Sequence, residues 1–243
     1  YMQCDPLFRK GNHNKLTFPM MYAFSENYIL ALSHDEVVHG KRSLLDKMWG
    51  SYEEKFAELK LLYMFMYAHP GKKLLFMGGE FGQFVEWRFA QQLDWLLEDY
   101  PAHAKLHRFS ADLNEFYRSN PSMYEIEREH GDWKGFKWLN AEDSANSVLS
   151  FIRIDAAENE KIAVVLNFTP VARTKYRIGV PEEGEYETVL STNAKCYGGD
   201  GKGSRKLKTH KVPSNGYPYS IETDIPPLTG MYLKFRAKKA RNK

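Results

Sequence analysis

The chain has 243 residues, of which 43% are hydrophobic and 27% are charged, as is typical of a globular protein with one large domain or two smaller ones. The formal net charge is +3, but six cations and no acid lie in the last ten residues. The rest of the chain is therefore slightly acidic, and we expect no nucleic acid partner. The longest apolar run, residues 61–68, is far shorter than the roughly 20 residues that span a bilayer, so we expect no membrane partner.

The two cysteines, Cys4 and Cys196, lie too far apart for a metal-ligand spacing, and the sequence contains no signal-like segment. We therefore predict a cytoplasmic protein with no metal site and no cofactor. The chain begins at Tyr1 and runs at once into dense, structured-looking sequence, which suggests a piece of a longer protein.

The first half of the chain alternates predicted strands and helices. An apolar run at residues 28–32 predicts a buried strand, and apolar side chains at three- and four-residue steps predict a helix over residues 53–68. A second apolar run at residues 73–77, stopped by two glycines, predicts another buried strand, and residues 102–117 predict an amphipathic helix. This order is typical of a parallel α/β sheet or barrel.

Beyond Pro121 the periodicity changes to that of β-strands. Short runs rich in Val, Ile, Tyr and Phe are separated by turn-forming residues and lie at 147–154, 162–168, 175–180, 185–190, 219–223 and 231–235. Strands at such regular spacing predict an antiparallel β-sandwich. We place the domain boundary near Asn120, so that residues 1–120 and 121–243 form separate domains and the second ends in the basic tail.

A glycine-rich loop at residues 198–203 invites comparison with a phosphate-binding loop. It lacks the Lys-Ser/Thr ending of that motif, and it does not lead from a strand into a helix. The segment therefore predicts a surface loop and no nucleotide site.

The most informative segment directly follows the predicted strand at residues 28–32. It places two imidazoles and two carboxylates within six residues, namely His34, Asp35, Glu36 and His39. A carboxylate where a strand leaves the core costs several kcal/mol to desolvate unless it is paired or used. An ion-pair cluster with Lys41 and Arg42 is one explanation, and a functional site is the other.

Three kinds of chemistry could use this cluster. A two-histidine metal site is disfavoured, because a five-residue step turns the rings of His34 and His39 about 140° apart on a helix and to opposite sides on a strand. A His-Asp dyad would need a nucleophile, and no Ser or Cys lies in an elbow-like context. In carbohydrate chemistry, by contrast, a carboxylate stabilises an oxocarbenium-like transition state while a neighbouring imidazole binds a hydroxyl.

Aromatic residues in the adjoining loops suit a polysaccharide groove, since flat rings pack on sugar faces. They are Trp49, Phe81, Phe84, Trp87 and Trp95. For any single one of them, packing in the core is the alternative.

Residues 33–45, with the sequence SHDEVVHGKRSLL, closely resemble the fourth signature region of bacterial 1,4-α-glucan branching enzymes of the α-amylase superfamily. The resemblance extends in order through DPLFR (5–9), LTF (16–18), MYAFSEN (21–27), HPGKKLLFMGGEFGQ (69–83), EW (86–87), LDW (93–95), NFTP (167–170) and PPL (226–228). The sequence departs from the family at Ala31, where Pro is frequent, at Gly78-Gly79, where Gly-Asn is frequent, and at Arg88, where Asn is frequent.

The resemblance implies that residues 1–120 are the last βα units of a (β/α)₈ TIM barrel and that residues 121–243 are the C-terminal β-sandwich domain. By resemblance, Asp35 is the transition-state stabiliser, and His34, Glu36 and Trp87 belong to the substrate-binding set, with Glu36 and His39 as support. The Asp nucleophile and the Glu acid/base of the family come from earlier barrel strands, so we expect neither in this chain.

The implied reaction is retaining. The enzyme cleaves an α-1,4-glucan and transfers the released chain to a 6-hydroxyl, forming the α-1,6 branches of glycogen. We expect the isolated piece to be inactive, the full-length protein to be a monomer, and α-1,4-glucan or glycogen to be the partner. The alternatives are a debranching or trehalose-forming hydrolase of the same superfamily and a catalytically dead glucan-binding module.

Overall fold

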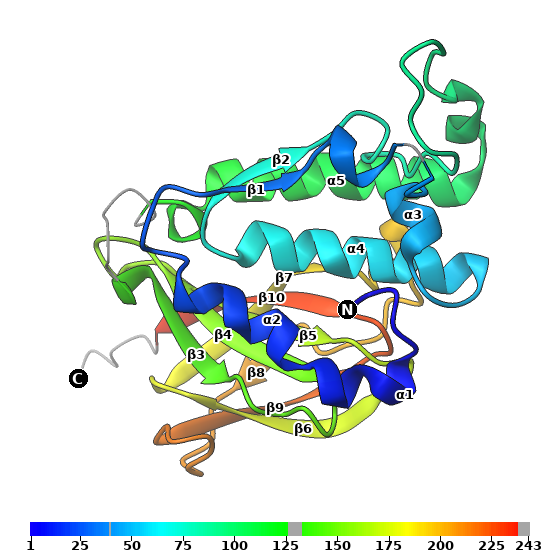
Figure 1. The fold of residues 1–243 in the computed structure, drawn as a ribbon. Coiled ribbons are helices and arrows are strands. Elements are labelled where there is room, and N and C mark those ends of the chain that lie inside the picture. Colours follow the sequence, from blue (N-terminus) through cyan, green and yellow to red (C-terminus); the bar gives the residue numbers. More distant parts are fainter. Residues whose placement is uncertain (39, 126–132, 238–243) are drawn as a thin grey trace.

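The computed structural model describes residues 1–38, 40–125 and 133–237. His39 of the polar cluster and residues 238–243 of the predicted basic tail lie outside these ranges. In the described part of the chain, a parallel pair of strands and two long helices lie above the antiparallel sheets (Figure 1).

The parallel pair consists of β1 (Ile29–Leu32) and β2 (Lys72–Leu75), with Ile29 opposite Lys72 and Leu32 opposite Leu75. The prediction of two parallel strands is confirmed, although β2 lies one to two residues earlier than predicted. Both strands were expected to be buried, yet their residues alternate between exposed and partly buried, with Ile29 61% and Leu74 39% exposed. One face of the pair packs against the helices, and no described element covers the other.

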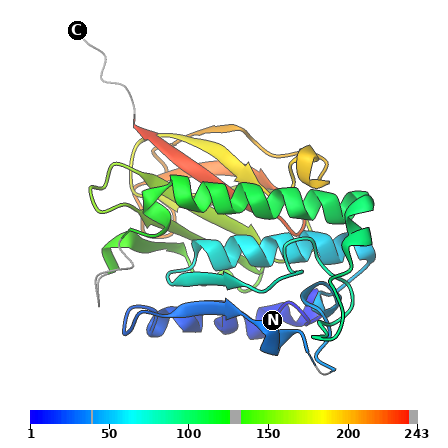
Figure 2. The same ribbon diagram turned by 90° about the horizontal axis from the view of Figure 1, so that it is seen from above.

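Helix α4 (Tyr52–Ala68) connects β1 to β2, and α5 (Pro101–Ser119) lies beside α4 (Figure 2). A capping box starts α4, because Ser51 Oγ accepts from the amide of Glu54 and the Glu54 carboxylate accepts from the amide of Ser51. Tyr63 and Met64 are fully buried, so α4 is covered on more than one side.

Shorter helical segments lie mainly before β1 and around the loops. They are α1 (Pro6–Arg9), η1 (Lys10–Asn12), α2 (Asn14–Thr17), η2 (Phe18–Met21), η3 (His34–Glu36), α3 (Leu44–Lys47), η4 (Trp95–Asp99), η5 (Pro121–Met123), η7 (Trp133–Gly135) and η8 (Lys195–Tyr197).

The second half forms two antiparallel sheets, as predicted. The six-stranded sheet runs in the order β3 (Phe136–Asn140), β4 (Val148–Ile154), β5 (Lys161–Asn167), β10 (Gly230–Ala237), β7 (Gly184–Ser191) and β8 (Lys206–Lys208). The smaller sheet pairs β6 (Arg173–Val180) with β9 (Tyr219–Ile225). The sequence pattern did not predict β3 and β8, because each is short and carries lysines among its apolar residues.

The six-stranded sheet is buried on both faces, and β5 shows this residue by residue. Val164 and Leu166 contribute to a core shared with α4 and α5, whereas Ala163 and Val165 contribute to a second core beneath β6 and β9. Successive side chains of a strand point to opposite faces, so both sets must be apolar. This explains the continuous apolar run over residues 162–166.

Side chains from the six-stranded sheet hold α4 by its backbone carbonyls. The Tyr232 hydroxyl donates to the carbonyl of Met64 at 2.6 Å, and Arg153 Nη1 donates to the carbonyl of Ala68, the last residue of α4, at 2.6 Å. The carbonyls at a helix C-terminus lack partners within the helix, so Arg153 satisfies one of them and places a cation where the helix dipole favours it. The helix that leads into β2 is thereby fixed to the sheet.

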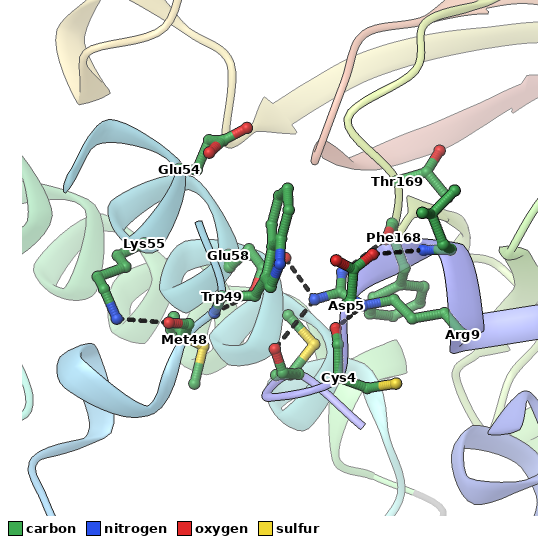
Figure 3. A network of polar contacts seen from close by, with 12 residues as sticks. Cys4, Asp5, Arg9, Met48, Trp49, Glu54, Lys55, Glu58, Phe168 and Thr169 are labelled. Carbon is green, nitrogen blue, oxygen red and sulfur yellow. Dashed lines mark hydrogen bonds and ion pairs between the residues drawn. The ribbon is translucent and has the colours of Figure 1, made fainter. Parts of the chain in front are cut away.

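Arg9 ties the N-terminal segment to the same core (Figure 3). Its guanidinium donates to the carbonyl of Phe168 at 2.7 Å and lies 2.6 Å from a carboxylate oxygen of Glu58 on α4, and both side chains are fully buried. The Glu58 carboxylate in turn accepts from the amide of Trp49 at 3.2 Å. One planar guanidinium thus joins three segments that are distant in the sequence.

Candidate active site at the end of β1

The polar cluster begins where β1 ends. Ser33 Oγ accepts from the amide of Asp35 at 3.3 Å and starts the short helical turn η3 (His34–Glu36). The amide of Phe76, just past β2, donates to the carbonyl of Leu32 at 2.9 Å, so the segments that follow the two strands lie side by side. Parallel α/β sheets bind ligands at this carboxyl edge.

His34 and Asp35 both face solvent at this edge. Their side chains are 55% and 72% exposed, and His34 Nε2 lies 3.6 Å from Asp35 Oδ1. The His34 ring lies 6.0 Å from the ring of Phe76 and 6.4 Å from that of Trp87, measured between centroids. The imidazole is therefore packed on two aromatic rings while the carboxylate beside it remains accessible.

Arg42 and Glu36, two charged neighbours of this pair, are engaged elsewhere, which argues against a closed ion-pair cluster. Arg42 Nη1 lies 3.8 Å from Asp46 Oδ2, and Lys47 Nζ lies 3.7 Å from Glu36 Oε2. Among the described residues, Asp35 forms its ion pair with His34. Asp35 is thus an exposed acid with little local compensation.

A loop from beyond β2 braces the segment that follows the cluster. Glu86 Oε2 accepts from the amide of Gly40 at 2.8 Å and from that of Arg42 at 3.4 Å, and the amide of Trp87 donates to the carbonyl of Val37 at 2.9 Å. Gly40 and Arg42 have φ angles of 78° and 66°, and this left-handed conformation is unfavourable for arginine. The Glu86 carboxylate helps to hold the backbone in that shape.

The structure therefore brings together two of the predicted substrate-binding residues, His34 and Trp87, beside Asp35. Glu36 turns its carboxylate towards Lys47 instead. Sequence reasoning did not assign Phe76 and Glu86 to the site; Glu86 was seen only as part of a family motif. Its contact with Gly40 spans 46 residues, which no local pattern signals.

The candidate groove aromatics divide between the core and the surface. Phe81 is fully buried, so core packing explains it. Trp95 packs on Phe81 with ring centroids 5.2 Å apart but remains largely exposed, and Phe84 is exposed beside Tyr52.

Within the described ranges, no three His, Cys, Asp or Glu side chains are grouped so that they could hold a metal ion. No helix in the same part of the chain is both long and apolar enough to cross a membrane.

Residues 138–236 match the family description "Alpha amylase, C-terminal all-beta domain". Across 235 residues, 96% of this chain, the sequence is 51% identical to the 1,4-alpha-glucan branching enzyme of Halothermothrix orenii and 49% identical to that of Aquifex aeolicus. It is 47% identical over 239 residues, 97% of this chain, to the branching enzyme of Nitrosococcus oceani.

The chain spans 37% of the length of the first two relatives and 31% of the third. The chain is thus similar to the C-terminal part of the bacterial 1,4-α-glucan branching enzymes, and its residues 138–236 match the α-amylase C-terminal all-beta domain.

Proposed function

We propose that this chain is part of a 1,4-α-glucan branching enzyme, which cleaves an α-1,4-glucan and transfers the released chain to a 6-hydroxyl to form an α-1,6 branch in glycogen. The observation that carries the proposal is an exposed His34–Asp35 pair at the carboxyl end of a parallel strand, in a chain that is 51% identical to a relative of that name. The activity is proposed for the whole protein, since the chain spans 37% of that relative.

The proposed architecture is the last two βα units of a (β/α)₈ barrel over residues 1–120 and the C-terminal β-domain over residues 121–243. Parallel strands occur almost only in sheets covered on both faces, and β1 and β2 expose one face. Further barrel strands beside this pair would remove its edges, and the helices around them would cover the apolar side chains that it now exposes.

In the proposed mechanism, Asp35 stabilises the positive charge that develops on the sugar ring, and His34 hydrogen-bonds a hydroxyl of the same sugar. Trp87 supports the His34 ring and contributes an apolar surface to the substrate site. Glu36 belongs to the predicted binding set, but its contact with Lys47 favours a supporting role through the turn η3.

Retaining transfer also needs a nucleophile and an acid/base about 5 Å apart. The proposal assigns neither to this chain, nor a metal or a cofactor, so we expect the 243-residue chain alone to be inactive. The proposed setting is a cytoplasmic monomer that acts on glycogen.

A chimera tests the proposal. The chain replaces the matching segment of the Halothermothrix orenii branching enzyme, and α-1,6 linkages formed on amylose are measured by NMR of the anomeric protons. We expect the chimera to form α-1,6 branches. We expect Asp35→Asn to lower its kcat by about 10²- to 10³-fold, because a preorganised charge that stabilises the transition state is lost.

The exposed Asp99→Asn serves as the matched control and should leave the rate unchanged. A chimera that folds but makes no α-1,6 linkages would refute the branching proposal. Reducing ends that accumulate without new branches would support the hydrolase alternative.

A further inference from the structure

We propose that the loop of residues 83–94 forms an additional glucan-binding subsite beside His34 and Asp35, with Trp87 as its apolar platform. The loop encloses an open pocket of about 310 Å³, lined in part by Glu86, Trp87, Arg88, Gln91, Gln92 and Asp94. That volume lies at the lower end of the range of small-ligand sites. The inference rests on the proposed glucan chemistry of the neighbouring residues.

Trp87 connects the pocket with the His34–Asp35 pair. Its ring lies 6.4 Å from the ring of His34 and 5.1 Å from that of Phe76, measured between centroids, and it is nearly perpendicular to the Phe76 ring. The same side chain also lines the open pocket. A glucan that touches His34 can therefore continue along the indole into the loop.

The loop is already held in one conformation. Binding therefore does not have to include the free-energy cost of ordering it, which would lower the affinity. The buried side chain of Gln83 accepts from the amide of Asp94 at 3.1 Å and donates to the carbonyl of Val85 at 3.3 Å, so it ties the two ends of the loop together. The amide of Gln91 donates to the carbonyl of Arg88 at 3.1 Å and closes a turn between them.

The lining suits a neutral, hydroxyl-rich ligand. Arg88, Gln91 and Gln92 are exposed and offer planar groups of fixed geometry, which can each bind sugar hydroxyls. The charge of Arg88 is offset by Glu86 and Asp94, so the pocket offers no attraction for a phosphate. A second pocket beside β7 contrasts with it, because its ionisable lining residues are Lys195, Lys202 and Arg205.

The three exposed side chains Arg88, Gln91 and Gln92 are the ones that would hydrogen-bond the sugar hydroxyls. Glu86 and Gln83, by contrast, already hydrogen-bond the backbone, at the amide of Gly40 and the carbonyl of Val85 respectively. Substituting the exposed set should therefore remove ligand contacts and leave the loop in place.

The test uses the chain itself, labelled with 5-fluorotryptophan and followed by ¹⁹F NMR. The chain has five tryptophans, and the Trp87 resonance is assigned by its absence in Trp87→Phe. We expect maltopentaose to shift this resonance in a saturable manner and cellopentaose to leave it unmoved. The triple variant Arg88→Ala/Gln91→Ala/Gln92→Ala should weaken maltopentaose binding at least fivefold, whereas Lys208→Ala on β8 should not change it.

The subsite inference is overturned if maltopentaose leaves the Trp87 resonance unmoved, if the triple variant binds as well as the parent, or if cellopentaose binds equally. Its failure is separable from that of the branching proposal, because Asp35 does not line the pocket. Asp35→Asn should therefore bind maltopentaose within twofold of the parent in this assay, although it lowers the branching kcat of the chimera at least 10²-fold. An active chimera whose Trp87 resonance never responds would refute the subsite alone.

Discussion

The ionisation of Glu58 is strongly tied to the fold. Burial is the largest influence and raises the pKa of Glu58 to about 7, although Arg9 beside it acts in the opposite direction. Removing a carboxylate from water is costly enough to outweigh even a close guanidinium. Arg9 keeps carbonyl partners at Cys4, Met2 and Phe168 whether or not Glu58 carries charge.

This raised pKa predicts a pH-dependent stability. A folded-state pKa above the unfolded value means that the native chain binds the extra proton, so the contribution is full below about pH 4.5 and is lost as the pH rises through 7. The free energy of unfolding of the parent, relative to Glu58→Gln, should fall by on the order of 1–3 kcal/mol between pH 5 and pH 8. Urea titrations at the two pH values measure it, and parallel pH profiles of the two proteins would contradict it.

Glu160 provides a control of opposite sign. Burial alone would raise its pKa, but hydrogen bonds from Lys234 and Ser122 outweigh burial and lower the pKa of Glu160. The stability that Glu160 contributes is present above its unfolded pKa and is lost as the pH falls. The parent should therefore lose stability relative to Glu160→Gln on acidification.

At the scale of elements, the segment after β1 depends on a loop that follows β2. The Glu86 carboxylate on that loop accepts hydrogen bonds from the backbone amides of both Gly40 and Arg42. Ser43 adds a further link, since its hydroxyl donates to the carbonyl of Phe84 at 2.9 Å. The two loops therefore form one unit at the edge of the parallel pair.

Removing this carboxylate should loosen the unit locally. A hydrogen bond to a charged acceptor contributes about 1.5–3 kcal/mol, so Glu86→Ala should speed amide hydrogen exchange at Gly40 and Arg42 about tenfold or more. Glu86→Gln keeps an acceptor and should restore most of the protection. Unchanged exchange in Glu86→Ala would mean that the Gly40 turn holds its shape without this contact.

At the scale of the whole molecule, exposed apolar side chains recur on the N-terminal helices and around the parallel pair, and we call this set the exposed apolar surface. Its exposed side chains are Leu7, Phe8, Phe18, Met21, Tyr22, Ile29, Leu74 and Met77, with Leu7 78% and Phe8 66% exposed. Isolated apolar side chains on a surface are normal, but a group of this kind marks a contact surface.

Charged substitutions on this surface should make the isolated chain less prone to self-association but should make the chimera less stable. In the chain alone, Leu7→Lys/Phe8→Glu should reduce self-association, because less apolar surface is exposed. In the chimera, the same pair should reduce stability if the preceding barrel covers these side chains. Light scattering and thermal unfolding measure the two effects, and a chimera that tolerates the pair would contradict the barrel contact. Val212→Lys, an exposed apolar position outside this surface, is the matched control.

Local pattern predicted much of the fold. The three- and four-residue spacing of apolar residues predicted α4 and α5 to within two residues at each end. The apolar runs beyond Pro121 predicted six strands of the antiparallel sheets. Short elements such as β8 escaped, because three residues carry too little periodicity to detect. The sequence could also name His34 and Asp35 as a pair, because adjacent residues need no tertiary structure to meet.

The sequence by itself determined the resemblance to branching enzymes, the strand-helix order of the first half and the antiparallel β character of the second. Only the tertiary structure decided that Asp35 is exposed, that Glu36 pairs with Lys47, and that Glu86 and Trp87 brace the site from 44 or more residues away. Arg9 meets the carbonyl of Phe168 across 159 residues in the same way. Periodicity records how a segment packs, whereas a contact between distant segments depends on the whole chain and leaves no local trace.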